Sequence, residues 1–277
     1  MTSRPVVLGV VSDCHTNSQL GLCPPEGVAL DEGGRYMPNK AQLWSWECWE
    51  DYHAKLQSLR KTHKAKLVYV TNGDAFDGDH HGTAQIITRN TENQAFIAER
   101  VFSVPKKLKA DEYHVVRGTT VHVGEGGASE EALAKYFGIE QDETTRMRSV
   151  WHLRLSVYGR EIDLQHHCSV GGLPWTRPGG VARLAFRHMA ERFNAGTRPA
   201  DIIIRSHVHV HGDSYGMHQT RAIITPAWQL KTSHGHKVAP ESIADIGGIA
   251  IVVDPSGEYE VKKYLYQPSL PEPRRVA

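Results

Sequence analysis

Aspartate and histidine residues occur in five short segments of the chain, and each segment follows a stretch that is rich in apolar residues. The segments contain Asp13 and His15, Asp74 and Asp77, Thr119 and His122, His166 and His167, and His207 and His209. Carboxylates at the edge of a core are costly unless they are paired or bind a metal. Mixed carboxylate and imidazole ligands without thiolates suit Mn, Fe, Zn or Ni better than Ca or Mg. The five segments together predict a metal site.

Each segment taken alone also has an ordinary structural explanation. Asp74 and Asp77 could form an Asp-Gly turn after a strand about as well as a metal site. The Asp13-x-His15 triple could arise by chance in a chain with 17 histidines. Cys14, between these two residues, is interpreted as a packed thiol, since nothing nearby in the sequence would lower its pKa. The coincidence of all five segments favours metal binding over these separate explanations.

The apolar runs that precede the five segments are predicted to be strands. They cover residues 6–11, 67–72, 113–116, 161–164 and 201–205, and 161–164 is the second arm of a β-hairpin whose first arm is 151–157. In α/β proteins the loops at the carboxyl ends of strands carry the chemistry. Histidines at i and i+2 of an extended segment point the same way, so His207 and His209 could share one site.

The remaining elements are expected to pack around these strands. Helices are predicted at 41–60, 92–109, 129–137 and 180–194, with Ser129 capping the third helix and Gly138 ending it. Strands at 221–225, 248–253 and 259–265 are expected to be antiparallel. Residues 20–40 are expected to form a long loop over the mouth of the site. The polar loop 79–82 could line a substrate cleft or be solvated surface.

Composition narrows the class of protein. The net charge of +1 gives no global attraction to nucleic acid, although a local basic groove is still possible. The four cysteines form no C-x-x-C pair, and no apolar run approaches the length of a membrane span. The first residues contain no cleavable apolar signal. We therefore expect a cytoplasmic protein with no membrane association. Residues 1–277 are expected to form one domain, with a poorly ordered Pro-rich tail from about 267.

The order of the motifs resembles the calcineurin-like metallophosphoesterase family. Its pattern runs D-x-H, G-D-x-x-D, G-N-H-[DE], a lone His and G-H-x-H, and the resemblance covers residues 6 to about 210. Two motifs depart from the pattern: Ser206 replaces a glycine, and the third motif is altered in a way most similar to homologues from phage and prophage genomes. The resemblance implies an α/β (α+β) fold, a β-sandwich of two mixed sheets flanked by helices.

The resemblance also implies two divalent metal ions, of Mn, Fe, Zn or Ni, with Mn favoured. Asp13, His15 and His209 would hold the first ion, and Asp74 would bridge the two ions. The second ion would be held by His207 and by a histidine at the end of the hairpin. His166 is preferred to His167 for that role, because in relatives the ligand comes as the strand ends.

The altered third motif leaves the roles of its residues open. Thr119 stands where the family has a metal-binding Asn, and its hydroxyl is expected to be a weak oxygen ligand. His122 is expected to act as the general acid, with a role as a nitrogen ligand as the alternative. Asp77 is expected to orient a histidine or a loop. Arg117 could contact the substrate phosphate or be an ordinary surface cation.

The predicted function is hydrolysis of a phosphate ester by a water activated between two metals. A phosphodiester or nucleotide is favoured over a phosphoprotein as substrate. One alternative is a nuclease acting on DNA, although no basic block or basic-aromatic stripe supports it. The other alternative is a binding scaffold that has lost catalysis, although such a scaffold would leave costly carboxylates without a metal. The sequence predicts no particular oligomeric state.

Overall fold

Val6–Val11 forms β1, which is buried along its whole length at the centre of a five-stranded sheet. The computed structural model describes residues 3–31, 33–79, 82–168, 176–269 and 273–276. The strand order of this first sheet is β12-β11-β1-β4-β5, where the other strands are β4 (Lys66–Asn72), β5 (Glu112–Val116), β11 (Ile246–Val253) and β12 (Tyr259–Tyr266). Strands β1, β4 and β5 are parallel, and β11 and β12 complete the sheet in antiparallel register.

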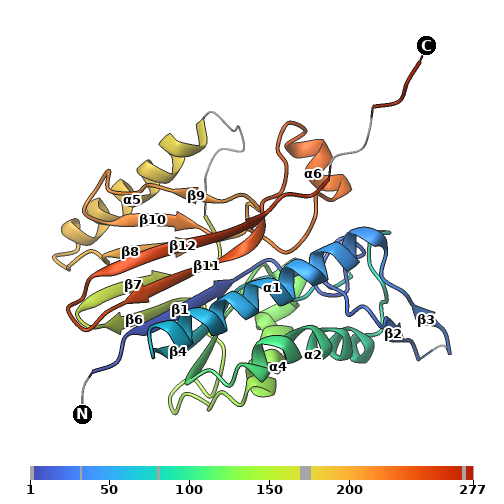
Figure 1. The fold of residues 1–277 in the computed structure, drawn as a ribbon, viewed down its shortest axis with the longest axis horizontal. Coiled ribbons are helices and arrows are strands. Elements are labelled where there is room, and N and C mark those ends of the chain that lie inside the picture. The colour runs from blue at the N-terminus through green and yellow to red at the C-terminus, as the bar shows by residue number, and fades with distance from the viewer. Residues whose placement is uncertain (1–2, 32, 80–81, 169–175, 270–272, 277) are drawn as a thin grey trace.

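A second five-stranded sheet faces the first (Figure 1). Its order is β6-β7-β8-β10-β9, with β6 (Leu153–Val157), β7 (Arg160–Leu164), β8 (Ile202–Arg205), β10 (Arg221–Ile224) and β9 (Gly212–Asp213). β6 and β7 form the expected hairpin. The expected antiparallel pairing of 221–225 is only half correct: β10 is antiparallel to the short β9 but parallel to β8. The reason is that β10 is buried on both faces inside the sheet, as is typical of parallel strands.

Alternation along the strands divides the core into three layers. Val6, Leu8 and Val10 of β1 pack between the sheets against residues such as Ile202 and Ile204 of β8. The intervening residues of β1 pack against helices on the outer face of the first sheet. Another apolar layer lies between the second sheet and the helix α5 (Arg177–Asn194). The predicted sandwich of two mixed sheets flanked by helices is therefore confirmed.

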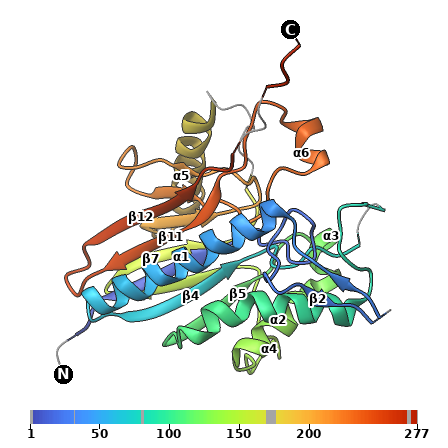
Figure 2. The same cartoon turned by 45° about the vertical axis from the view of Figure 1, so that its right-hand side comes forward.

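The helices cover the outer faces, and Figure 2 shows α1, α2 and α4 grouped on the side away from α5. They are α1 (Lys40–Thr62), α2 (Thr91–Lys107), α3 (Thr120–Val123), the short 3₁₀ turn η1 (Glu125–Gly127), α4 (Ala128–Phe137), α5, and α6 (Ser233–Val238). α4 ends at Gly138 as expected, but Gly127 and not Ser129 is its N-terminal cap. Gly127 has a left-handed backbone that glycine adopts at little cost, so the helix begins two residues earlier.

Two irregular regions differ from a plain loop or tail. Residues 20–40 contain a small antiparallel pair, β2 (Val28–Ala29) with β3 (Arg35–Tyr36). β12 ends at Tyr266, and the part of the expected tail that the structure describes, 267–269 and 273–276, contains neither helix nor strand. Within the predicted loop 79–82, residues 80 and 81 lie outside the described residues. None of the helices in the described segments has the length and apolar character needed to cross a membrane.

Candidate metal centre

The candidate centre lies where the carboxyl ends of parallel strands from both sheets meet. Side-chain hydrogen bonds join these strand ends: Ser12 Oγ lies 3.0 Å from Thr225 Oγ1, which lies 2.7 Å from Ser206 Oγ. Asn72 Nδ2 donates to the same Ser206 Oγ at 2.7 Å. The serine that replaces the glycine of the family motif therefore links β4 of one sheet to β8 of the other.

Backbone geometry singles out the predicted ligands. A positive φ is uncommon for residues other than glycine, and such strain persists where the surrounding structure imposes it, often at functional sites. Five predicted ligands have this geometry: Asp13, His15, Asp74, His207 and His209, with φ between 42° and 77°. The turn at each strand end thus directs a ligand side chain inward instead of letting the strand continue.

Asp13, His15 and His209 form one group of potential ligands. One ligand atom from each lies within 4.8 Å of the others. His209 Nε2 is 3.3 Å and His15 Nε2 is 4.0 Å from Asp13 Oδ1. Asp13 Oδ2 accepts hydrogen bonds from Ser12 Oγ and from the backbone N–H of His207, at 3.2 Å for the latter. These bonds fix the carboxylate so that Oδ1 faces the two rings.

Asp74 lies between this group and a second one. Its Oδ2 is 3.9 Å from His15 Nε2 and 3.0 Å from His166 Nε2. Thr119 holds the carboxylate, with its backbone N–H donating to Oδ1 at 2.6 Å and its hydroxyl donating to Oδ2 at 3.1 Å. His166 Nδ1 donates to the Asn72 carbonyl at 2.8 Å, which leaves Nε2 toward Asp74. This placement matches that expected of a bridging carboxylate and a histidine ligand.

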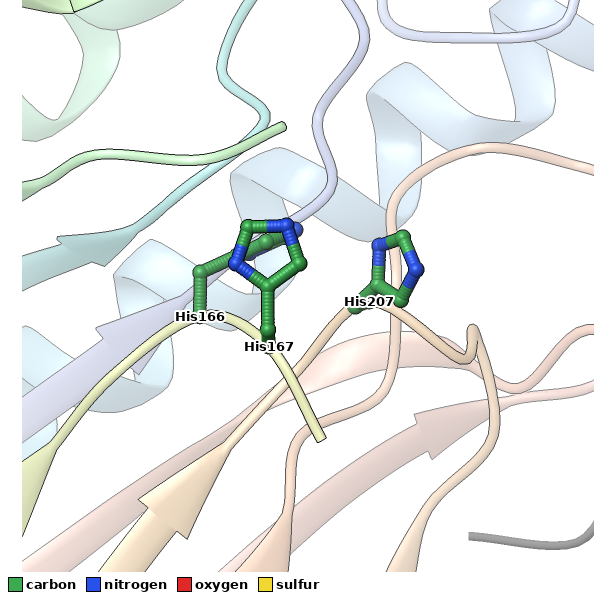
Figure 3. A group of neighbouring side chains, drawn as sticks. All are labelled: His166, His167 and His207. Carbon is green, nitrogen blue, oxygen red and sulfur yellow. The ribbon is translucent and has the colours of Figure 1, made fainter. Parts of the chain in front are cut away.

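His207 and His167 complete the second group with His166. Figure 3 shows that the first two residues follow one strand end and His207 follows the neighbouring one. One nitrogen from each ring lies within 4.8 Å of the others. His166 is buried, whereas His167 is the exposed member of the group. The structure thus brings together both histidines between which the sequence pattern has to choose.

The donor atoms fit divalent metal ions. Among the described residues, Asp13 Oδ1 and both ring nitrogens of His15 are buried without a hydrogen-bond partner. The nearest oxygen to His15 Nδ1, among its printed ion-pair contacts, is Asp77 Oδ1 at 3.6 Å. Buried polar atoms without partners cost free energy, and imidazole with carboxylate is the ligand chemistry of Zn, Fe and Ni, with carboxylate also suiting Mn.

The charges of the centre are strongly coupled through short distances. Burial alone would raise the pKa of Asp13 and Asp74, but the neighbouring ring of His166 outweighs it and holds both well below their usual range. Burial alone would lower the pKa of His166, yet the Asp74 and Asp13 carboxylates raise it to about 10. Burial lowers the pKa of His15 and of His207. The two buried carboxylates thus need positive charge nearby, which a proton on His166 or a cation supplies.

His122 lies beside the first group through a short helix. The expected loop after β5 contains α3, whose single turn begins after Thr119, with the His122 N–H donating to the Thr119 carbonyl at 2.9 Å. His122 Nδ1 is 2.8 Å from Asp77 Oδ1, and its ring meets that of His15 edge-on at 4.6 Å. Burial opposes protonation, but Asp77 outweighs it and raises the pKa of His122. The extra residues of the altered motif form the turn that returns this histidine to the site.

Arg117 is buried at the end of β5 with 8% of its surface exposed, so the alternative of an ordinary surface cation is wrong. Its Nε donates to Ser149 Oγ at 2.9 Å and its Nη2 donates to the Ser149 carbonyl at 3.1 Å. The guanidinium also lies over the Trp151 ring at 5.5 Å. These contacts tie β5 to the segment before β6. A contact with substrate phosphate stays a prediction.

Glu130 is a buried acid at the centre that the sequence analysis missed. Its Oε2 accepts a hydrogen bond from the Gly118 N–H at 2.6 Å, and Oε1 accepts from the Ala75 N–H at 3.4 Å. Burial, and secondarily Asp74, raises its pKa to about 8. A signal was present in the sequence: Glu130 falls at i with Leu133, Ala134 and Phe137 at i+3, i+4 and i+7, the buried stripe of α4.

Cys14 is fully buried, and burial raises the pKa of its thiol well above the usual range. A thiol in this state is a poor nucleophile, because the thiolate is the reactive form. This agrees with its interpretation as a packed side chain.

Comparison with known proteins places this geometry beside three solved structures. No family model and no curated protein matches the sequence. The chain is similar to wild-type Vps29 complexed with Zn²⁺ from Entamoeba histolytica, at 10% identity, a TM-score of 0.39, and coverage of 94% of this chain and 98% of that one. It is similar to a hypothetical protein from Pyrococcus horikoshii OT3, at 10% identity, a TM-score of 0.43, and coverage of 95% and 89%. It is also similar to a dimetal phosphatase from Danio rerio, at 9% identity, a TM-score of 0.42, and coverage of 95% and 100%.

Proposed function

We propose that this protein hydrolyses phosphate esters with two divalent metal ions bound at the centre. The observation that carries the proposal is the convergence of two buried carboxylates, Asp13 and Asp74, with imidazoles from both sheets. Several of these donor atoms have no hydrogen-bond partner among the described residues. The order of motifs that resembles the calcineurin-like metallophosphoesterases supports the same reaction.

The ligand groups suggest how the ions would be held. Asp13, His15 and His209 would bind the first ion, and His166 and His207 the second. Asp74 Oδ2, which faces both groups, would bridge them. When bound, two such ions lower the pKa of a water to form hydroxide and neutralise charge on the phosphoryl oxygens. Thr119 keeps Asp74 in place through its two hydrogen bonds.

His122 is the proposed general acid. With its Nδ1–H donating to Asp77, its Nε2 is the nitrogen that delivers a proton to the leaving oxygen. Asp77 raises the pKa of His122 and so favours the protonated form that an acid requires. Asp77 therefore acts by positioning His122 and does not need to touch a metal.

A phosphodiester or nucleotide is the proposed substrate class. A cavity of about 1220 Å³ begins at His167 and His207 and continues along α5. Its lining includes Arg183 and Arg187, whose cations suit a second anionic group of a substrate. A nuclease would use the same cavity for a longer chain, and the assay below separates these cases.

The test combines metal counting with a substrate panel. Purified protein is analysed for bound elements and assayed on a phosphomonoester, a phosphodiester, a cyclic nucleotide and single-stranded DNA. Two metal equivalents with hydrolysis of the diester or nucleotide are expected. Asp74→Asn should lose both metal and hydrolysis, whereas Asp51→Asn on the outer side of α1 should lose neither. A folded wild-type chain that binds metal but cleaves nothing would favour a binding scaffold and overturn the proposal.

A further inference from the structure

The hydroxyl of Thr119 is surrounded by more hydrogen-bond acceptors than it can satisfy. Thr119 Oγ1 lies 3.2 Å from His167 Nε2, 3.2 Å from His207 Nδ1 and 3.5 Å from His166 Nε2. It is also 3.1 Å from Asp74 Oδ2. A hydroxyl has one proton to donate. Three imidazole nitrogens and a carboxylate oxygen thus converge on one point, an arrangement that a shared cation stabilises.

Both neighbouring histidines reach this point because the chain has left the sheet. Successive side chains of a strand point to opposite faces, but β7 ends at Leu164, two residues before His166. The His166 and His167 rings have centroids 4.9 Å apart at 88°, and the His167 and His207 centroids are 5.0 Å apart. Figure 3 shows the three rings rising on the same side of their chain segments.

We propose that His167 is a third imidazole ligand of the second metal ion, together with His166, His207 and Asp74. The assignment rests on the proposed two-metal function and deepens it. In this chain Thr119 replaces the asparagine of the family motif, so one strong ligand of that ion has to come from elsewhere. His167 supplies it from a different strand end, and Thr119 instead holds Asp74 through hydrogen bonds.

A second site with three imidazoles and one carboxylate prefers different metals from a carboxylate-rich one. Imidazole suits Zn, Fe and Ni, whereas carboxylate and carbonyl oxygen suit Mn, Mg and Ca. The second ion is thus expected to be Zn, Fe or Ni, although Mn is favoured by the motif pattern alone. Cobalt(II) is a useful probe because it binds the same ligands, comes just below Ni in affinity order and absorbs visible light.

The experiment titrates metal-free protein with Co²⁺ and follows the visible absorption, with bound metal counted by elemental analysis. The variants are His167→Ala, His167→Asn, which restores an amide oxygen, and the control His63→Ala at the far end of α1. Wild type and His63→Ala should bind two ions. His167→Ala should bind the first ion normally and the second at least about 10-fold more weakly with an altered spectrum. His167→Asn should recover part of that loss.

The outcomes separate this assignment from the proposed function. If folded His167→Ala binds two ions with wild-type affinity and spectrum, His167 is no ligand and the assignment is overturned. If wild type binds two Co²⁺ ions and His167→Ala loses the second, the assignment stands even when no ester is hydrolysed, and only the proposed function fails. If wild type binds fewer than two ions, both are overturned. Circular dichroism of each variant shows that it is folded.

Discussion

His122 Nδ1 and Asp77 Oδ1 are 2.8 Å apart, although 45 residues separate them in the chain. Asp77 follows β4, whereas His122 is carried by the single turn of α3 after β5. The Gly78 N–H donates to the His122 carbonyl at 2.9 Å and fixes the same contact from the backbone. The aspartate therefore sets the position, tautomer and charge of a histidine that contacts the ring of His15.

From this pair we expect His122→Ala to depend on the leaving group. It should keep its full metal content, lose little activity on nitrophenyl esters and lose roughly 10²–10⁴-fold on alkyl phosphate esters, because a poor leaving group needs the proton most. Rates on matched ester pairs and elemental analysis measure this. Asp77→Asn should show the same pattern more weakly. An equal loss on both esters, or loss of one metal equivalent, would make His122 a ligand.

Metal removal should destabilise the fold as well as abolish activity. A ligand that binds only the folded state stabilises it by mass action, at about 2.7 kcal/mol when its concentration is 100 times its Kd. A chelator should therefore lower the Tm of wild type, and added metal should restore it. Asp74→Asn, which lacks the bridging charge, should show a much smaller shift in the same thermal scans. An identical shift in Asp74→Asn would place the stabilising metal elsewhere.

Gly73 and Gly33 provide a matched test of close packing at the centre. Their φ angles are +89° and +87°, so alanine imposes the same backbone strain at both. A Cβ at Gly73 would lie 2.3 Å from His166 Nδ1, whereas a Cβ at Gly33 would meet nothing within 4 Å. Gly73→Ala should weaken metal binding by displacing His166. Gly33→Ala should lose only stability, as measured by denaturation. Equal metal affinity in the two variants would contradict a fixed position for His166.

His53 should make the fold sensitive to acid independently of the metal centre. Its Nδ1 donates to the Trp49 carbonyl at 2.7 Å, and its Nε2 accepts from the Tyr69 hydroxyl at 2.9 Å. Burial lowers the pKa of His53 to about 3. Between pH 6.5 and 3 the unfolded chain binds a proton that the folded chain does not, so stability falls as the pH falls.

The slope from this one group approaches about 1.4 kcal/mol per pH unit. Urea denaturation of metal-free protein at pH 7, 5.5 and 4 measures it, and His53→Gln should have a smaller slope. An unchanged slope in a folded His53→Gln would show that other groups cause the acid sensitivity. The metal-free form is used so that titration of the centre is the same in both proteins.

The strand ends were predictable because local patterns specify them. Val6 to Val11 is continuously apolar and then stops at two polar residues, so both β1 and the position of Asp13 follow from the sequence. The parallel pairing of β10 with β8 was not predictable, because pairing partners depend on distant residues. Ser129 had the right chemistry for a helix cap, but the left-handed Gly127 two residues earlier begins the helix.

The site was predictable as a set of residue types but not as a set of contacts. Motif spacing identified Asp13, Asp74 and His209, yet it could not show that both His166 and His167 reach one point, because that depends on where β7 ends. The role of Glu130 depends on backbone N–H groups that belong to two other segments. Arg117 carries a charge that suggested the surface, and only its contacts with Ser149 show that it is buried.

The ligands of each proposed ion come from both sheets, and this makes the sandwich a spacer. Asp13 and Asp74 follow strands of one sheet, whereas His166 and His209 follow strands of the other. The layer of Val and Ile side chains between the sheets sets how far apart these two sets of ligands stand. A larger or smaller residue at a core position such as Val10 or Ile204 therefore alters metal affinity and metal–metal distance from inside the molecule, without contact with either ion.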